Sequence, residues 1–153
     1  MAIWPWRSRP TVQPWNDDYN VTTRALPTGL TPIASDLIIP DNIFAQIIYI
    51  TANLTNVAGA RVNQFVNWQL YRSNALVLHS AYHLNTSTGQ LSISYATTYA
   101  GLFMALDPMH ATQYLPHNFL LLPNDIFSFA VTGGLAGDTL DACLVTLKQW
   151  EIY

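Results

Sequence analysis

The stretch QLSISYA, residues 90–96, decides the fold class of this chain. Its apolar residues Leu91, Ile93 and Tyr95 alternate with two serines. A two-residue period sends successive side chains to opposite faces of a β-strand, whereas a helix needs a period of about 3.6 residues. The stretch therefore predicts a strand with one buried face and one solvated face.

The same character extends in both directions along the chain. NIFAQIIYITANL (42–54) is nearly continuous in apolar and β-branched residues, which is typical of a central strand covered on both faces. RVNQFVNWQLY (61–71) alternates apolar residues with asparagine and glutamine, apart from the imperfections at Gln64 and Phe65. Further strands are expected over 75–82, 125–132 and 139–150, with turns over 72–74 and over the glycine-rich 133–138.

A helix is expected at no more than one place. Residues 99–114 could form a short helix ended by Pro108, or equally a long loop between strands. The chain shows no alternation of strands with helices of the kind that builds parallel sheets. Short strands joined by Gly, Asn and Pro turns predict an all-β fold, an antiparallel β-sandwich of jelly-roll type, over residues 33–153.

The N-terminal segment differs from this domain. Five of the nine prolines lie in residues 1–32, and three of the five tryptophans lie in the first fifteen residues. Proline removes a backbone donor and fixes φ, which favours an extended path. We therefore predict an extended N-terminal arm over residues 1–32, preceding the sandwich domain.

The composition limits the kinds of partner. Half of the residues are apolar and only 10% are charged, against about 25% in a typical protein. Such a surface suits occlusion in an assembly and favours an oligomer. The net charge is −3 and Lys148 is the sole lysine, so nucleic acid is not expected as a main partner. No apolar run reaches the eighteen or so residues of a membrane span, so no membrane is expected and synthesis in the cytoplasm is the default.

Residues with metal or acid–base chemistry are few and scattered. His79 and His83 have a chelating spacing for a helix but would be about 13 Å apart along a strand. The predicted β context therefore argues against a shared ion, and His110 and His117 have no cluster of ligands beside them in the sequence. We expect no metal, no cofactor and no catalytic residue, although a Ser/His/Asp set assembled in space stays open because such sets are not sequential.

The remaining candidate groups have structural interpretations. Asp138, after Gly137, fits turn formation better than acid–base catalysis. Cys143, the only cysteine, sits in the apolar run ACLVTL and is expected to be a small buried hydrophobe. Exposed aromatic rings could instead stack on sugars, which would make this a carbohydrate-binding sandwich. The candidates for that role are Trp68, Tyr71, Tyr82, Tyr95 and Tyr99.

The order of motifs resembles a known family. IPDNIFAQIIYITANLTNVAGARVNQFVNWQLY, then QLSISYATTYAG, then LLLPNDIFSFAVTGGLAGDTLDACLVTLKQWEIY are similar to a β-sandwich module of minor structural proteins of tailed bacteriophages. The likeness covers about three quarters of the chain and excludes the arm. It implies a virion protein without catalysis, such as a capsid decoration (cement) protein, a head-fibre base or a tail component. A receptor- or glycan-binding module at a tail tip is the alternative.

The arm and this resemblance together give a hypothesis for function. We expect the arm to cross a neighbouring subunit and to add to its strand edges, with aromatic rings in pockets and arginines paired to acidic groups. The expected interface residues are Trp4, Trp6, Arg7, Arg9, Trp15 and Tyr19. The expected partners are copies of the chain itself, a trimer being one arrangement, and the major capsid protein or other proteins of the virion.

Overall fold

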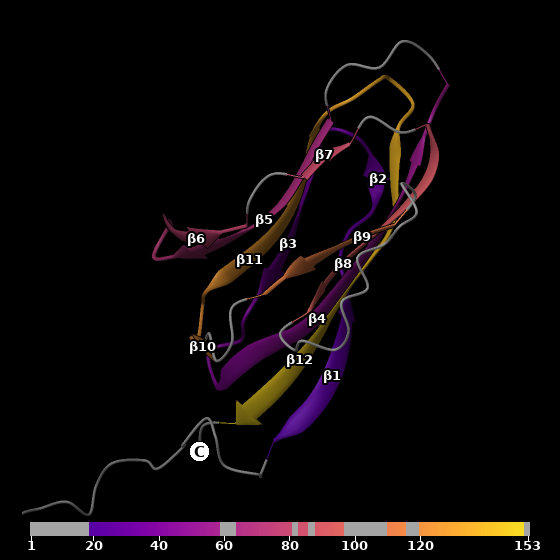
Figure 1. Ribbon diagram of the computed structural model, residues 1–153. Helices are drawn as coiled ribbons and strands as arrows, with labels where there is room; N and C mark the ends of the chain where they lie inside the picture. Colours follow the sequence, from indigo (N-terminus) through magenta and orange to yellow (C-terminus); the bar gives the residue numbers. More distant parts are fainter. Residues whose placement is uncertain are drawn as a thin grey trace, which may run out of the picture.

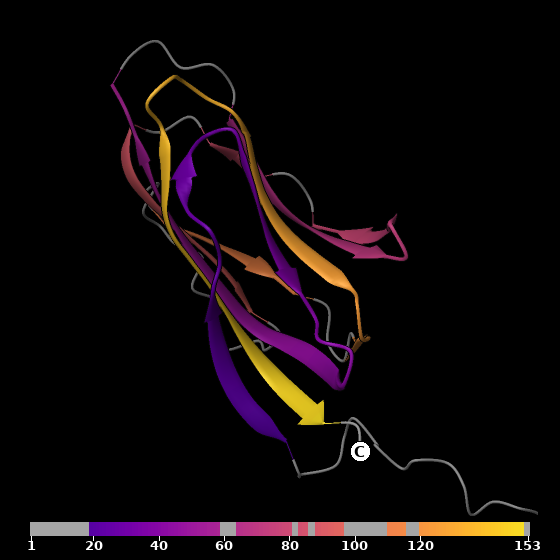
Figure 2. The same cartoon turned by 180° about the vertical axis from the view of Figure 1, so that it is seen from behind.

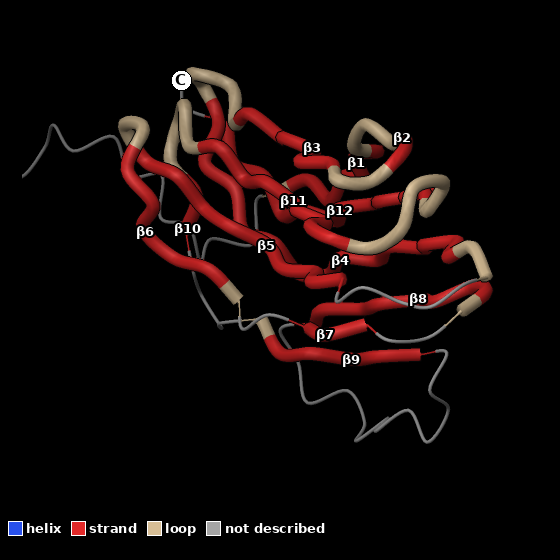
Figure 3. The backbone as a smooth tube through the Cα atoms, turned by 90° about the horizontal axis from the view of Figure 1, so that it is seen from above, coloured by secondary structure: helices blue, strands red, loops and turns tan. Residues whose placement is uncertain are grey.

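The computed structural model describes residues 19–58, 64–80, 83–85, 88–96, 110–115 and 120–151. Regular structure in these ranges is entirely β-strand (Figure 3). The strands are β1 (Asn20–Ala25), β2 (Gly29–Leu30), β3 (Ile33–Ile38), β4 (Ile43–Asn56), β5 (Gln64–Arg72), β6 (Ala75–His79), β7 (His83–Asn85), β8 (Gly89–Ala96), β9 (His110–Tyr114), β10 (Leu120–Leu121), β11 (Ile126–Gly133) and β12 (Thr139–Glu151). Within the described ranges, the structure contains no helix of the length and apolarity that crossing a bilayer requires.

The strands form two sheets (Figure 1). Sheet A has the order β1-β12-β4-β8-β9, with β2 attached to β12 and β10 attached to β4. Sheet B has the order β3-β11-β5-β6, with β7 also attached to β5. Neighbouring strands are antiparallel with the exception of β8 and β9, which run parallel. The prediction of an all-β, mainly antiparallel fold is confirmed.

The strand pairs are nested along the chain. The first strand pairs with the last (β1 with β12), β3 pairs with β11, β4 pairs with β8, and β5 pairs with β6 and β7. Successive pairs alternate between sheet A and sheet B. The chain is therefore one long antiparallel ribbon wound into two layers. Within each layer, one ladder connects two of the nested strand pairs: β12–β4 in sheet A and β11–β5 in sheet B.

The core lies between the two sheets. Leu91, Ile93 and Tyr95 of β8 are at most 1% exposed, which confirms the prediction for QLSISYA. Across the gap, the ring of Tyr95 meets the ring of Phe129 on β11 edge-on, with their centroids 6.3 Å apart. On the neighbouring strand, Trp68 stacks on Phe127 at 6.2 Å. The Tyr95–Phe129 contact joins the two layers, whereas the Trp68–Phe127 contact lies within sheet B, and both pairs bury large apolar rings in the core.

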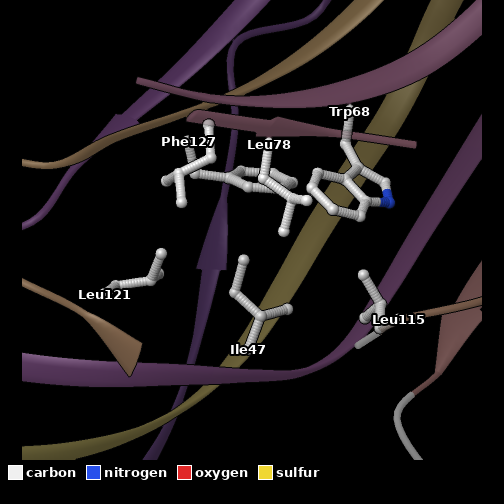
Figure 4. Close-up of a pocket in the computed structure, with 7 residues that line it drawn as sticks. Ile47, Trp68, Leu78, Leu115, Leu121 and Phe127 are labelled. Atoms are coloured by element: carbon white, nitrogen blue, oxygen red, sulfur yellow. The ribbon is translucent and has the colours of Figure 1, made fainter. Parts of the chain in front are cut away.

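A small cavity lies in this core (Figure 4). Its lining is entirely apolar and comes from both sheets and the segments beside them: Ile47, Trp68, Leu70, Leu78, Leu115, Leu121 and Phe127. Its volume is about 20 Å³, which is room for one water-sized sphere. Because drug-sized ligands need pockets of about 300 Å³ or more, this cavity is a packing gap and not a binding site.

The glycine-rich turn before β12 is organised by a buried carboxylate. Gly134 and Gly137 have positive φ angles, as expected for a tight connection. The fully buried Asp138 accepts hydrogen bonds from the backbone amides of Leu135 (2.9 Å) and Val57 (2.9 Å) and from the Gln64 side-chain amide (3.1 Å). The predicted turn role of Asp138 is confirmed, and the same carboxylate also joins this turn to the end of β4 and the start of β5.

The structure departs from the sequence-based expectations in three places. Residues 20–30, assigned above to the arm, contain β1 and β2 of sheet A, because β1 pairs with β12 along six residue pairs. Residues 110–114, considered for a helix or loop, form β9, while 99–109 lie outside the described residues. Gln64, the polar residue that interrupts the apolar series of 61–71, is fully buried in phase with Val66, and its side-chain amide donates to Asp138 there.

The network around Asp138 gives a stability prediction. Replacing Asp138 with alanine leaves three donors, one buried and two part-buried, without this acceptor, so we expect the free energy of unfolding to fall by about 3 kcal/mol. Asp141→Ala is the matched control, because that carboxylate is exposed and bonds the hydroxyls of Thr55 and Thr139 at the surface. Its expected cost is below about 1 kcal/mol. Urea denaturation of both variants makes the comparison, and equal midpoints would contradict the structural role of Asp138.

Candidate subunit interface

The outer face of sheet A is the side turned away from the core. On β12, Cys143, Val145 and Leu147 are buried, so the alternating residues Leu144 and Thr146 point outward. The register of the β1–β12 and β12–β4 ladders shows which residues of β1 and β4 lie on the same face. Thr23 and Tyr49 lie beside Thr146, Ala25 and Thr51 lie beside Leu144, and Val21 lies beside Lys148.

Large apolar side chains are exposed on this face. Val21 is 56% exposed, and Tyr49 and Leu144 are each 41% exposed. They come from three neighbouring strands, β1, β4 and β12, so they belong to one surface and not to scattered loops. Single exposed apolar residues are ordinary, whereas a group on one flat face is typical of a contact surface.

The polar groups between them are hydroxyls that bond one another. The Thr23 and Thr146 hydroxyl oxygens lie 3.1 Å apart across the β1–β12 ladder. The Tyr49 hydroxyl donates to the Ser94 hydroxyl on β8 at 3.2 Å. A polar group that keeps a hydrogen bond costs far less to bury than one that loses it. Covering this face with another protein therefore carries a small desolvation cost.

One corner of the face is aromatic and carries a positive charge. Tyr19, directly before β1, contacts the ring of Trp150 near the end of β12, with centroids 5.9 Å apart. The Lys148 ammonium lies 4.6 Å from the centroid of the Tyr19 ring, within the range of a cation–π interaction. Because residue 18 is bonded to Tyr19, the Trp/Pro-rich segment joins the sheet at this corner.

The face is large enough to make a specific contact. Its four main strands, β1, β12, β4 and β8, contain 41 residues. At a rise of about 3.3 Å per residue and a strand spacing of about 4.8 Å, they cover roughly 650 Å². A standard protein–protein interface buries about 800 Å² on each partner. The outer face thus supplies most of one standard interface.

Of the predicted interface residues, Tyr19 is the one within the described chain, and it lies at this aromatic corner. Trp4, Trp6, Arg7, Arg9 and Trp15 lie outside the described residues. The sequence analysis missed Val21, Tyr49, Leu144 and Trp150. Strand alternation alone could have predicted that Leu144 is exposed, since it lies out of phase with Cys143 and Val145. Which residues of β1 and β4 lie beside Leu144 depends on the register of the ladders.

The aromatic residues proposed for sugar stacking differ in how accessible the structure makes them. Trp68 is 4% exposed and Tyr95 is fully buried, so the core removes both from contact with a ligand. Tyr71 is partly exposed at the end of β5. Tyr82 and Tyr99 lie outside the described residues. Only Tyr71, of the three that the structure describes, keeps a surface on which a sugar could stack.

Metal-ligating side chains do not gather in the described part of the chain. No group of three or more His, Cys, Asp or Glu residues converges there. His79, at the end of β6, has its Nδ1 atom 2.9 Å from the backbone oxygen of Ser80. His117 and the side chains of His83 and His110 lie outside the described set.

Cys143 is buried between the sheets, as predicted. Its exposed fraction is 1%, and burial raises the pKa of its thiol to about 12. The thiolate is the reactive form of cysteine, so at neutral pH the folded protein keeps this sulfur inert. Its position on the inner face of β12 makes it a core residue.

Comparison with known proteins gives no relative: no family model, curated protein or solved structure matches this chain.

The aromatic corner gives a second prediction. Tyr19→Ala removes the ring contact with Trp150 and the cation–π contact with Lys148, and we expect the free energy of unfolding to fall by about 1 kcal/mol. Tyr19→Phe keeps both ring contacts and serves as the control, with stability close to that of the parent protein. Thermal denaturation followed by circular dichroism measures both. A Phe variant as unstable as the Ala variant would contradict the ring contacts as the cause.

The burial of Cys143 gives a third prediction. At pH 8 the native protein should react with a thiol reagent such as DTNB far more slowly than the same protein in denaturant, because the thiol is enclosed and protonated. The ratio of the two rates is the measurement. Rapid labelling of the native protein, without loss of its β-sheet circular dichroism, would contradict the placement of Cys143 in the core.

Proposed function

We propose that this protein is a non-enzymatic structural protein of a bacteriophage virion, with a jelly-roll fold, that decorates the capsid as a cement protein. Its partners in this proposal are copies of itself, in a trimer, and the major capsid protein. The observation that carries the proposal is the outer face of sheet A, an exposed and nearly uncharged surface that begins at the corner where the tryptophan-rich segment joins.

The strand order supports the jelly-roll assignment. A jelly roll is a double-sheet fold of eight strands in two Greek keys, and it occurs in viral capsid and lectin domains. The eight main strands here form the layers β1-β12-β4-β8 and β3-β11-β5-β6, with the nested pairing of a rolled ribbon. In this assignment β2, β7, β9 and β10 are short additions to the eight-strand pattern.

The chemistry of the outer face supports a protein partner. Exposed apolar residues and mutually bonded hydroxyls are inexpensive to desolvate, whereas burying unpaired charges is costly. Protein–protein interfaces are depleted in charge at their centres and enriched in aromatic residues. The face presents Tyr49 and Leu144 near its centre and Lys148 toward one end. It is thus better suited to a flat protein surface than to a small molecule.

The N-terminal segment would extend this contact. Residues 1–18 contain Trp4, Trp6 and Trp15, separated by prolines that limit internal folding. Tryptophan is enriched among the residues that contribute most to protein interfaces. In the proposal the segment lies on a neighbouring subunit, with Arg7 and Arg9 paired to its acidic groups or carbonyls. Many copies acting together then reinforce the shell, and no catalytic step is involved.

Reconstitution tests this function. Full-length protein, a variant lacking residues 1–18, and Leu144→Lys are added separately to phage shells stripped of the protein, and binding is measured by cosedimentation. We expect the full chain to bind and both variants to lose about tenfold or more in affinity, because each removes apolar contact or buries an unpaired charge. Cryo-electron microscopy of the particles then locates the protein.

Ile38→Lys is the matched control for the charge. Ile38 is 62% exposed on β3 of sheet B, so its substitution adds the same lysine away from the outer face of sheet A. Its binding should equal that of the parent protein. Unchanged binding of both the truncated chain and Leu144→Lys would overturn the proposed interface. Density for the protein on the tail alone would overturn the capsid role in favour of a tail component.

A further inference from the structure

A second surface feature lies at one end of sheet B. A cleft of about 400 Å³ opens between the β5–β6 turn and the segment that leads into β11. Six of its nine lining residues carry polar side-chain groups: Tyr71, Arg72, Ser73, Asn74, Asn124 and Asp125. The β5–β6 hairpin projects from the body of the fold in two opposite views (Figures 1 and 2). The volume falls within the range of about 300 to 1,000 Å³ that is typical of small-molecule sites.

The turns that border this cleft hold polar side chains at positive φ angles. Within the described ranges, three non-glycine residues have positive φ: Ser73 (50°), Asn74 (63°) and Asn124 (65°). All three line this cleft. Glycine is the least costly residue at such angles, since a Cβ atom is disfavoured there. The chain instead carries three short polar side chains. Ser73 and Asn74 are the two central residues of the β5–β6 hairpin, where positive φ is the favoured geometry, and Asn124 lies in the turn closed by the Asp125 amide and the Leu122 oxygen.

An ion pair holds the two walls together. Arg72 on β5 donates through Nε to both carboxylate oxygens of Asp125 (2.9 and 3.2 Å) and through Nη2 to one of them (2.6 Å). Nη2 also donates to the backbone oxygen of Leu120 at 3.2 Å. Asp125 is 1% exposed and itself accepts a hydrogen bond from the Leu122 amide. The cleft therefore has a fixed shape before any ligand arrives.

The same ion pair sets the charge of the cleft. The positive charge of Arg72 is balanced by Asp125, so the pair is neutral overall. Its bonds to the described residues use Nε and Nη2, which leaves the two hydrogens of Nη1 as donors on a guanidinium that is 36% exposed. Asn74 and Asn124 add amide donors and acceptors, and Ser73 adds a hydroxyl. The polar groups are thus suited to hydroxyls and not to a charged ligand.

Tyr71 supplies an apolar surface beside these groups. Its hydroxyl donates to the Gln69 side-chain oxygen at 2.7 Å, which holds the ring in one orientation. Small-molecule sites combine an aromatic or apolar wall with a few placed polar groups. A sugar ring has hydroxyls at its edge and an apolar C–H face, so it matches both parts of this wall.

From these observations we propose that the cleft between the β5–β6 turn and the start of β11 binds a neutral saccharide. Asn74, Asn124, Ser73 and Nη1 of Arg72 bond its hydroxyls, and Tyr71 packs against its ring. The proposal does not rest on the capsid role, because the cleft is built from sheet B and its turns whereas the subunit interface is the outer face of sheet A.

The test uses the full chain and side-chain deletions that keep the backbone. A glycan array of defined neutral and acidic glycans is screened first, and the strongest neutral glycan is titrated by saturation-transfer NMR and calorimetry. Asn74→Gly and Asn124→Gly remove the proposed contacts at positions where glycine adopts the native φ freely. We expect each to weaken binding by about tenfold without lowering the melting temperature.

Asn53→Ala is the matched control, because Asn53 is an exposed asparagine on β4 of sheet A. Its sugar affinity should equal that of the parent protein. Three results would each overturn the proposal: no binding to any glycan on the array, binding confined to acidic glycans, or binding that the two glycine variants leave unchanged. None of them bears on the cosedimentation with shells, so the sugar site and the capsid role fail separately.

Discussion

The pairing of β12 with β4 is the interaction on which the rest of the structure depends. The two strands face each other from Ile43–Glu151 at one end to Thr55–Thr139 at the other, with two register irregularities. This ladder joins the outermost pair of the rolled ribbon, β1–β12, to the inner pair, β4–β8. Without it sheet A would separate into two ribbons, and isolated two-stranded ribbons are marginally stable in water.

Strand alternation divides the residues of this ladder between an inner face and an outer face. Strand alternation directs Cys143, Val145 and Leu147 into the core, so their neighbours Leu144 and Thr146 must point outward. The outward residues could have been charged without disturbing the core. Around Leu144 and Thr146 they are instead apolar residues and hydroxyls, with Lys148 toward one end, which is unusual for a permanently solvated sheet face and consistent with a covered one. Charged residues are also few in the chain as a whole, at 10% of the sequence.

The two proposed surfaces differ in construction, in line with the different kinds of partner proposed for them. The outer face of sheet A is flat, broad and built from strand residues, which is suited to another protein. The cleft at the end of sheet B is concave and built from turns, and the Arg72–Asp125 pair fixes its shape. Turn residues on a rigid sheet scaffold are common sites of ligand recognition. A sandwich can therefore hold one partner by a face and another by an end.

Sequence patterns predicted the fold class, six of the eight main strands (β4, β5, β6, β8, β11 and β12) and the burial of Leu91, Ile93, Tyr95 and Cys143, because period-two alternation and β-branched runs are local signals. They also marked the glycine-rich turn around Asp138. They did not determine that residues 20–30 join sheet A, that Gln64 is buried, or that β9 runs parallel to β8. Each of these depends on pairing between segments far apart in the chain. The tertiary structure alone decided the two surfaces for the same reason: Val21, Tyr49 and Leu144, like Arg72 and Asp125, become neighbours only once the ribbon is rolled.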